Sequence, residues 1–145
     1  MEEEPVPAEP AGGETHNGSR YASITTRVDW ANIRTGPSMN YEVLRAVSTG
    51  FPLLVLEQQD EWSQVEDYRK RKGWVANRLL DANTTVILKV KRENLYREPG
   101  LDAITAGIDY GTVLQIEDTR GEWLKVVSRE GIEGWLRKTD VWPGK

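Results

Sequence analysis

The sequence contains no cysteine and a single histidine, and each scarcity excludes a class of catalytic or metal site. Without cysteine there are no disulfides, no thiol nucleophile and no thiolate metal site. The one histidine, His16, lies in an acidic stretch with almost nothing to bury, so neither a Ser/His/Asp triad nor a histidine metal site has a scaffold there. Carboxylate pairs such as Glu117-Asp118 are adjacent in sequence, so on a strand they point to opposite faces. We therefore expect no catalytic residues, no metal site and no cofactor.

Long apolar runs are also missing, and no segment has the length of a membrane span or a signal peptide. The start, Met-Glu-Glu-Glu-Pro, is typical either of a cytoplasmic tail or of a chain from which a signal has been trimmed. Five glutamates fall within Met1 to Gly18, which leaves 18 acidic residues against 19 basic ones elsewhere. The folded part is thus near neutral and gives no sign of nucleic-acid binding. Residues 1–22 are predicted to form a disordered acidic tail, without ordered structure up to about Arg20.

From about Ser23 onward, short runs of β-branched, aromatic and leucine residues are broken every eight to twelve residues by turn formers, which is typical of all-β domains. The chain also repeats itself. Asn32 returns as Asn94 after 62 positions, whereas Gly50, Gly73-Trp74 and Val65 return as Gly111, Gly134-Trp135 and Val126 after 61. Two copies are too few for a solenoid. We predict two tandem β-barrels of about five strands each, over residues 23–82 and 83–145.

The turn after Arg34 and the two cores are the most specific structural expectations. Gly36 and Pro37 end a short β sequence, so Gly36 is predicted to hold a positive φ, and Gly36→Ala to destabilise the fold by about 1 kcal/mol or more through backbone strain. Asn77 to Leu80 could form one short 3₁₀ turn. The predicted first core is Val43, Val47, Leu53, Val55, Val65, Val75 and Leu79, and the predicted second core is Ile104, Val113, Ile116, Val126, Leu136 and Val141.

The run from Asn32 to Pro37, with Tyr41-Glu42-Val43, Gly50, Glu61-Trp62 and Gly73-Trp74-Val75, resembles the bacterial SH3 domain family. The first copy is covered almost entirely. In the second copy Tyr96 replaces the arginine and Glu98 the corner glycine, while Trp123 and Gly134-Trp135 keep the signature. The resemblance implies two SH3-like barrels that act as non-catalytic binding modules of a bacterial envelope protein, periplasmic or extracellular. By the same resemblance, the ligand would be peptidoglycan, its stem peptides or an envelope protein.

Aromatic residues are the candidate binding residues. Trp62 and Trp74 are explained as plugs of a small barrel, because Trp123 and Trp135 recur in the second copy. Only the first copy also has Arg34, so a second reading places a ligand-binding groove there. In that reading Tyr41, Trp62 and Trp74 form an aromatic groove for an extended peptide, with Arg34 as a carboxylate partner.

Two further features each allow a structural explanation and a binding explanation. The basic run Arg69 to Lys72 is either a solvated hairpin tip or a contact for an acidic polymer or lipid headgroup. The spacing Pro7-Ala8-Glu9-Pro10 allows self-binding to an SH3 domain.

Taken together, the sequence and the resemblance predict a monomeric binding protein for peptidoglycan or a peptide, without nucleic-acid partners or a membrane span. The alternative is a structural adaptor for another protein, and an enzyme comes third.

Overall fold

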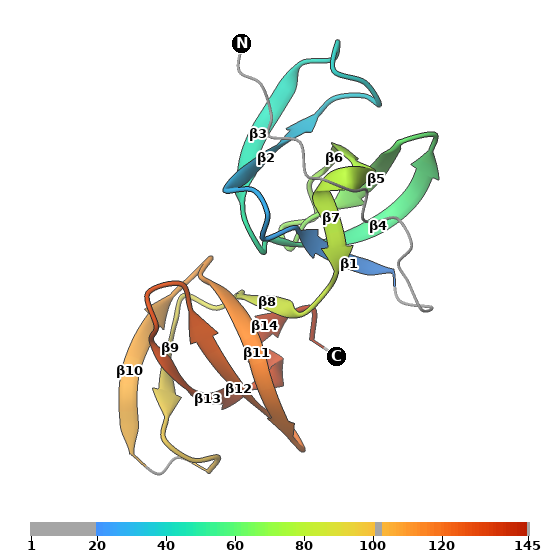
Figure 1. The fold of residues 1–145 in the computed structure, drawn as a ribbon. Helices are drawn as coiled ribbons and strands as arrows, with labels where there is room; N and C mark the ends of the chain where they lie inside the picture. Colours follow the sequence, from blue (N-terminus) through green and yellow to red (C-terminus); the bar gives the residue numbers. More distant parts are fainter. Residues whose placement is uncertain (1–19, 101–102, 145) are drawn as a thin grey trace. The chain divides into compact units, whose positions relative to one another are not determined.

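The computed structural model describes residues 20–100 and 103–144, and it divides the chain into two compact units between Asn83 and Thr84. Each unit holds one antiparallel sheet of seven strands (Figure 1). The predicted all-β class is therefore confirmed, and the estimate of about five strands per copy is too low. In each unit the strand order is linear, so the described part of the chain shows open sheets where closed barrels were expected.

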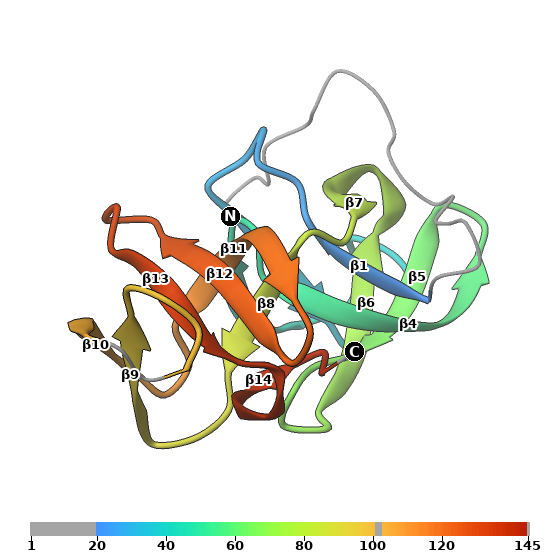
Figure 2. The ribbon, with the colours of Figure 1, turned by 90° about the horizontal axis from the view of Figure 1, so that it is seen from below.

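The first unit has the strand order β3-β2-β6-β5-β4-β1-β7. Its strand β1 lies between β4 and β7, and Figure 2 shows β1 running alongside β4. Because β1 begins at Tyr21, residues Tyr21 and Ala22 belong to the sheet and not to the predicted tail, of which residues 1–19 fall outside the described residues. The elements are β1 Tyr21–Ile24, β2 Trp30–Arg34, β3 Val43–Ser48, β4 Pro52–Gln59, β5 Trp62–Glu66, β6 Lys72–Ala76, η1 Asn77–Leu79 and β7 Leu80–Ala82.

The second unit repeats this arrangement in the order β10-β9-β13-β12-β11-β8-β14. Its elements are β8 Thr85–Leu88, β9 Arg92–Tyr96, β10 Ile104–Asp109, β11 Val113–Arg120, β12 Trp123–Ser128, β13 Glu133–Arg137, η2 Lys138–Asp140 and β14 Val141–Trp142. Even a bulge recurs. Leu56 of β4 and Glu117 of β11 are each the extra residue at a register shift against the neighbouring strand. The expected 3₁₀ turn is confirmed as η1, and the sequence reasoning missed its counterpart η2.

Each unit has its own core of alternating strand residues. Of the predicted core residues, Val47, Leu53, Val65, Val75, Leu79, Val126, Leu136 and Val141 are buried, Val55 and Ile116 are partly buried against the clusters, and Val113 is half-buried. Val43 and Ile104 are wrong, because they are 44% and 59% exposed. Both lie at the start of an edge strand, where a side chain has a neighbouring strand on one side only.

Two kinds of glycine explain much of the repeat. Gly50 and Gly111 have φ of 78° and 83°, a backbone conformation that other residues rarely adopt, and they form the turns before β4 and β11. Gly73 and Gly134 are needed for space, because a Cβ on either would overlap Ile33 or Leu95 of the adjacent strand. The conserved spacing of these glycines therefore records two turns and two close strand contacts.

The predicted positive φ of Gly36 is wrong, because Gly36 is not among the glycines in the left-handed region. The turn is made by a longer loop, in which Thr35 N–H donates to the carbonyl of Glu42 at 2.9 Å. Glycine is required here for another reason. A Cβ on Gly36 would lie 2.5 Å from ring atoms Cδ1 and Cε1 of Tyr41. The aromatic ring therefore occupies the space that a side chain would need.

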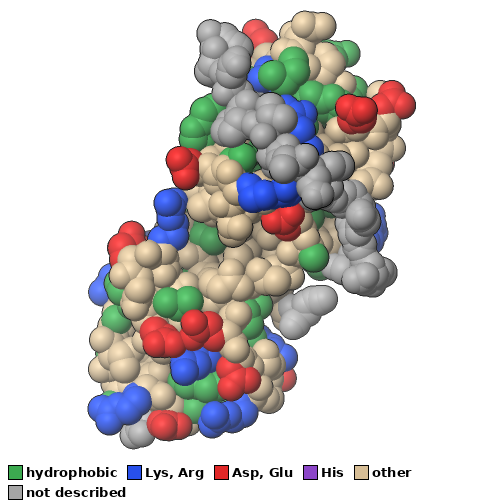
Figure 3. Space-filling model, in the orientation of Figure 1, with side chains coloured by type: hydrophobic (Ala, Val, Ile, Leu, Met, Phe, Trp, Pro, Cys, Tyr) green, Lys and Arg blue, Asp and Glu red, His purple; other side chains and the backbone are tan. Residues whose placement is uncertain are grey.

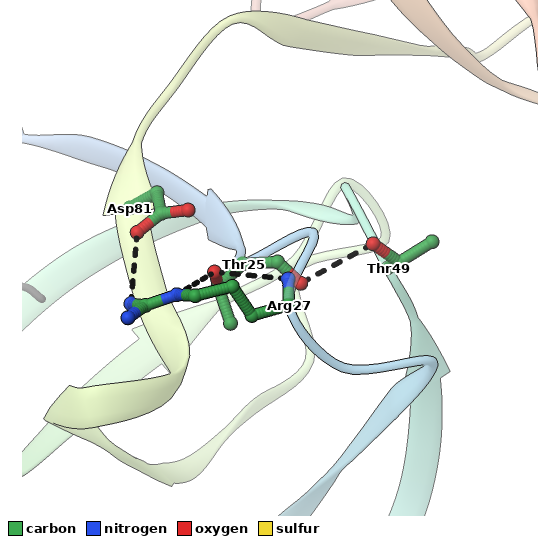
Figure 4. A network of polar contacts seen from close by, with 4 residues as sticks. All are labelled: Thr25, Arg27, Thr49 and Asp81. Carbon is green, nitrogen blue, oxygen red and sulfur yellow. Dashed lines mark hydrogen bonds and ion pairs between the residues drawn. The ribbon is translucent and has the colours of Figure 1, made fainter. Parts of the chain in front are cut away.

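A polar network fastens the end of β1 to the rest of the first unit (Figure 4). Thr25 is fully buried, and its Oγ1 accepts hydrogen bonds from the backbone N–H and the Nε of Arg27 at 3.3 and 3.2 Å. The Thr25 carbonyl accepts from Thr49 Oγ1 at 3.2 Å, and Arg27 reaches Asp81 of β7 at 3.7 Å. The network joins three segments that are distant in sequence.

Candidate functional site

Strand register places three of the four predicted site residues on one face of the first sheet. Arg34 of β2 is directly opposite Trp74 of β6, and Trp74 is opposite Gln64 of β5. Trp62 lies two residues before Gln64, so it points to the same face and is a diagonal neighbour of Trp74. We call Arg34, Trp62 and Trp74 the aromatic face. Both tryptophans are half-buried, and Trp62 also packs against the core.

Arg34 has a structural task in this face. It is only 4% exposed, and its Nη1 donates to the backbone carbonyls of Met39 and Tyr41 at 3.2 and 3.0 Å. These two bonds hold the loop that follows β2, and Ser38 closes the loop further through bonds to Gly36 and Tyr41. This buried guanidinium therefore helps to position Tyr41, and its role as a carboxylate partner stays a prediction.

Tyr41 is the most accessible of the four residues, with 47% of its surface exposed. The Tyr41 ring lies against Gly36, and the Tyr41 carbonyl accepts a hydrogen bond from Arg34. Arg34 therefore links the Tyr41 loop to the aromatic face. The binding role of Tyr41, Trp62, Trp74 and Arg34 remains a prediction. The geometry supplies a sheet face with two tryptophans and a loop that presents a tyrosine.

Sequence reasoning missed the apolar surface beside Tyr41. Met39, Val43 and Leu44 are 45%, 44% and 45% exposed, and the last two belong to the edge strand β3. Exposed apolar side chains at the start of an edge strand are a potential contact for another chain. The sequence contains these apolar side chains, but the core prediction for Val43 left them unrecognised as an exposed surface.

The second unit carries a different set of residues on the corresponding face. Trp123 is opposite Arg137, and Trp135 is opposite both Lys125 and Tyr96. The guanidinium of Arg137 lies over the Trp123 ring at 4.7 Å, and that of Arg120 lies over the Trp135 ring at 4.6 Å. Tyr96 meets Trp123 edge to face at 6.3 Å. The sequence identified the two tryptophans, whereas the arginines that cover them went unnoticed.

Two carboxyl pairs form between different elements of the second unit, where a search of adjacent residues could not find them. Burial and a hydrogen bond with Glu93 raise the pKa of Asp140 to about 6, against the lowering effect of Arg137. A hydrogen bond with Glu133 raises the pKa of Glu117, and the same bond lowers the pKa of Glu133. Neither pair builds a metal site, since residues 20–100 and 103–144 contain no cluster of three or more possible ligands.

The basic run forms a hairpin tip. Asp67 is 4% exposed and accepts hydrogen bonds from the backbone N–H groups of Arg69 and Arg71, each at 2.9 Å. Its other oxygen accepts from Arg71 Nε at 2.9 Å, while Lys70 takes a positive φ of 66°. One of the four charges is thus committed to the turn, which agrees with the structural explanation of the run. Ligand contact at this tip has no support in these bonds.

These features define a duplicated β module with an aromatic outer face, and comparison with known families identifies the module. Residues 29–81 and residues 89–143 each match a family model described as a bacterial SH3 domain. The chain belongs to the bacterial SH3 domain family, with two domains in tandem. Domains of this family are binding modules.

Among solved structures, the chain is similar to NlpC1 from Trichomonas vaginalis, with 14% identity and a TM-score of 0.40 over 92% of this chain and 49% of that one. It is also similar to an NlpC/P60 family protein from Bacillus cereus, with 16% identity and a TM-score of 0.39 over 83% and 55%. The chain thus spans about half the length of these proteins. No curated protein matches the sequence. Within the described ranges, no helix is long and apolar enough to cross a membrane.

Proposed function

We propose that this chain is a non-catalytic binding protein of the bacterial cell envelope, periplasmic or extracellular, whose first domain recognises peptidoglycan or its peptides. The observation that carries the proposal is the aromatic face together with Tyr41. Trp62 and Trp74 are diagonal neighbours on one sheet face, and Arg34 fixes the adjacent loop so that Tyr41 stays half exposed. Large aromatic side chains held in a fixed position bind at little entropic cost, which favours them as contact residues.

The proposed ligand contact runs from Tyr41 across Trp74 toward Trp62. Arg34 acts in this proposal by positioning Tyr41 through the Tyr41 carbonyl, since its Nη1 is already used in the loop. An extended peptide or a glycan could lie on such a face, because both offer flat apolar surfaces to aromatic rings. The acyl or glycosidic bonds of the wall would stay intact, in keeping with a binding module.

The test is cosedimentation of the full chain with purified peptidoglycan. Tyr41→Ala should lower the bound fraction, with an affinity loss of roughly tenfold if the ring contributes about 1.4 kcal/mol of contact energy. The substitution leaves the carbonyl that Arg34 binds, so the loop should survive. Tyr110→Ala is the matched control, because Tyr110 is 46% exposed but lies in the second domain. Undiminished binding by Tyr41→Ala, or hydrolysis of wall material by the pure chain, would overturn the proposal.

The second candidate function is a structural adaptor for another protein. The exposed side chains Met39, Val43 and Leu44 favour it, because an apolar edge strand can add a strand from a partner. This function predicts that the chain fails to sediment with peptidoglycan. It also predicts that Val43→Lys abolishes capture of an envelope protein, while Tyr110→Ala has no effect.

A further inference from the structure

The outer face of β11, β12 and β13 in the second domain carries a row of three aligned side chains. Arg120 of β11 is opposite Trp123 of β12, and Trp123 is opposite Arg137 of β13. Both arginines are exposed at their positions, while Trp123 is half-buried between them. We call Arg120, Trp123, Trp135 and Arg137 the arginine–tryptophan surface.

The rings and guanidinium groups of this surface are stacked. Arg137 lies 4.7 Å from the centroid of Trp123, and Arg120 lies 4.6 Å from that of Trp135. Trp135 is 4% exposed, whereas its counterpart Trp74 in the first domain is half-buried. Tyr96 also meets Trp123 edge to face, with 6.3 Å between the two ring centroids. The stacking fixes two flexible side chains in place before any ligand arrives.

The arginines are not required by the fold. Counted along the repeat, Arg120 corresponds to Gln59 and Arg137 to Ala76, and the first domain forms the same strands with those residues. The tryptophans recur in both domains, so folding accounts for them. The two arginines belong to the second domain alone and call for a separate explanation.

Their hydrogen-bonding capacity is largely free for a ligand. A guanidinium that stacks on a ring uses its flat face and leaves its N–H donors at the edge, where they match the two oxygens of a carboxylate. In the described part of the chain, neither arginine lies within ion-pair distance of a carboxylate, whereas Lys125 is paired with Glu133 at 3.7 Å. The surface thus offers two pre-positioned cationic forks.

We propose that the arginine–tryptophan surface is a second binding site, which takes an acidic peptide segment. Arg120 and Arg137 bind side-chain carboxylates of the peptide, and its apolar atoms lie against Trp123 and Tyr96. The site is separate from the aromatic face of the first domain, and the proposal does not depend on wall binding there. The chain would then join two ligands, one on each domain.

The charges around the surface favour a peptide over a polymer of phosphates. Glu117 and Glu133 stand close enough to share a hydrogen bond, and Glu133 is opposite Val127 on the same face as Trp135. Figure 3 shows acidic and basic side chains next to one another over β12 and β13. A peptide has backbone N–H groups for these carboxylates as well as carboxylates for the arginines. A phosphate polymer has no such donors and would be repelled by them.

The experiment follows the tryptophan indole N–H signals of the ¹⁵N-labelled full chain by NMR. The probe is the blocked peptide Ac-Ala-Glu-Ala-Glu-Ala-NH2, and the control peptide carries glutamine in place of glutamate. We expect the acidic peptide to shift the Trp123 signal and the control peptide to leave it in place. The double variant Arg120→Gln/Arg137→Ala, which installs the first-domain residues, should weaken binding at least about tenfold. Arg129→Gln removes one charge at the exposed β12–β13 turn and should bind as the unchanged chain does.

Several results would overturn the proposal. They are the absence of shifts at millimolar peptide, equal binding of the glutamine peptide, or undiminished binding by the double variant. Soluble polyphosphate that moves the same signals at lower concentration would show that the ligand class is wrong. If the double variant fails to fold, Arg137→Lys replaces it. Lysine keeps the charge but loses the planar fork, so affinity should still fall, and unchanged affinity would count against the site.

Discussion

Gly36→Ala distinguishes two physical reasons for a glycine at the corner after Arg34. The sequence suggested backbone strain, but the structure gives Gly36 an ordinary φ and places the Tyr41 ring where a Cβ would go. A Cβ at 2.5 Å from Tyr41 Cδ1 and Cε1 cannot be accommodated unless the ring moves. Because Tyr41 is half exposed, the ring can swing toward solvent instead of disrupting the core.

The size of the effect follows from the contact that the ring loses. A tyrosine that is 47% exposed keeps about half of its side chain covered, on the order of 100 Å², and uncovering all of it costs about 2.5 kcal/mol at ~25 cal/mol/Å². A partial rotation costs about 1 kcal/mol on the same scale. Against this, alanine at an ordinary φ stabilises by about 0.4–1 kcal/mol, because it restricts the unfolded chain. The expected net loss for Gly36→Ala is about 0–0.6 kcal/mol if the ring rotates only partly, and about 1.5–2.1 kcal/mol if the ring is fully uncovered.

The assay is a double-mutant cycle with Tyr41→Ala, read from hydrogen exchange of the buried first-domain amides of Val65 and Val75. Without the ring there is nothing for the new methyl group to meet. Gly36→Ala should then stabilise the first domain by about 0.4–1 kcal/mol, so the sign of the effect reverses. An equal loss of first-domain stability with and without the Tyr41 ring would refute the steric explanation and favour the explanation by backbone strain. Gly36→Ala should also weaken any ligand that contacts Tyr41.

Three further predictions concern single groups. The pKa of Asp140 should be near 6 by carboxyl NMR and should fall toward its usual value in Glu93→Gln. Because the folded pKa lies above the unfolded one, the stability contributed by the neutral acid is complete below about pH 4 and is lost as pH rises through 6. Asp140→Asn should remove this pH dependence of stability. Asp67→Ala should destabilise the hairpin by about 1–3 kcal/mol, measured by urea unfolding, because three donors lose their acceptor. Gly50→Ala should cost about 1–2 kcal/mol in the same assay through its positive φ, and a loss below about 0.3 kcal/mol would contradict the strain argument.

The repeat made much of the fold predictable from sequence. In a strand that is buried on one face, every second side chain faces the core, so a shift in register would expose the core residues. Glycines and tryptophans that recur 61 positions apart therefore imply that the strands recur in the same register. Gly73 and Gly134 illustrate this, because each is required by contact with a neighbouring strand. The prediction was wrong at Val43 and Ile104 because composition does not tell an edge strand from a central one. It was wrong at Gly36 because a close approach and a positive φ both select glycine.

The candidate sites were less predictable, since they depend on pairs of residues from different strands. Arg34 is a suitable carboxylate partner by residue type, yet its position under the Met39 to Tyr41 loop assigns its Nη1 to backbone carbonyls. Arg120 is 15 residues before Trp135 in sequence, and only the fold brings it over that ring. A motif search within one strand finds neither relation, because the first depends on the loop after β2 and the second on the pairing of β11, β12 and β13.

The outer faces of the two domains can diverge because the sheets constrain them weakly. Val65 and Val126 on the inner faces are fully buried and are the same residue type. The exposed residues Arg120 and Arg137 correspond to exposed Gln59 and to Ala76, which is buried in the first core. A change of this kind leaves the strand pairing intact but alters charge and hydrogen-bonding capacity where a ligand would lie. Duplication of one fold could therefore produce two binding surfaces of different chemistry within a single chain. A ligand that bound both domains equally well, and was unaffected by Arg120→Gln/Arg137→Ala, would contradict that division.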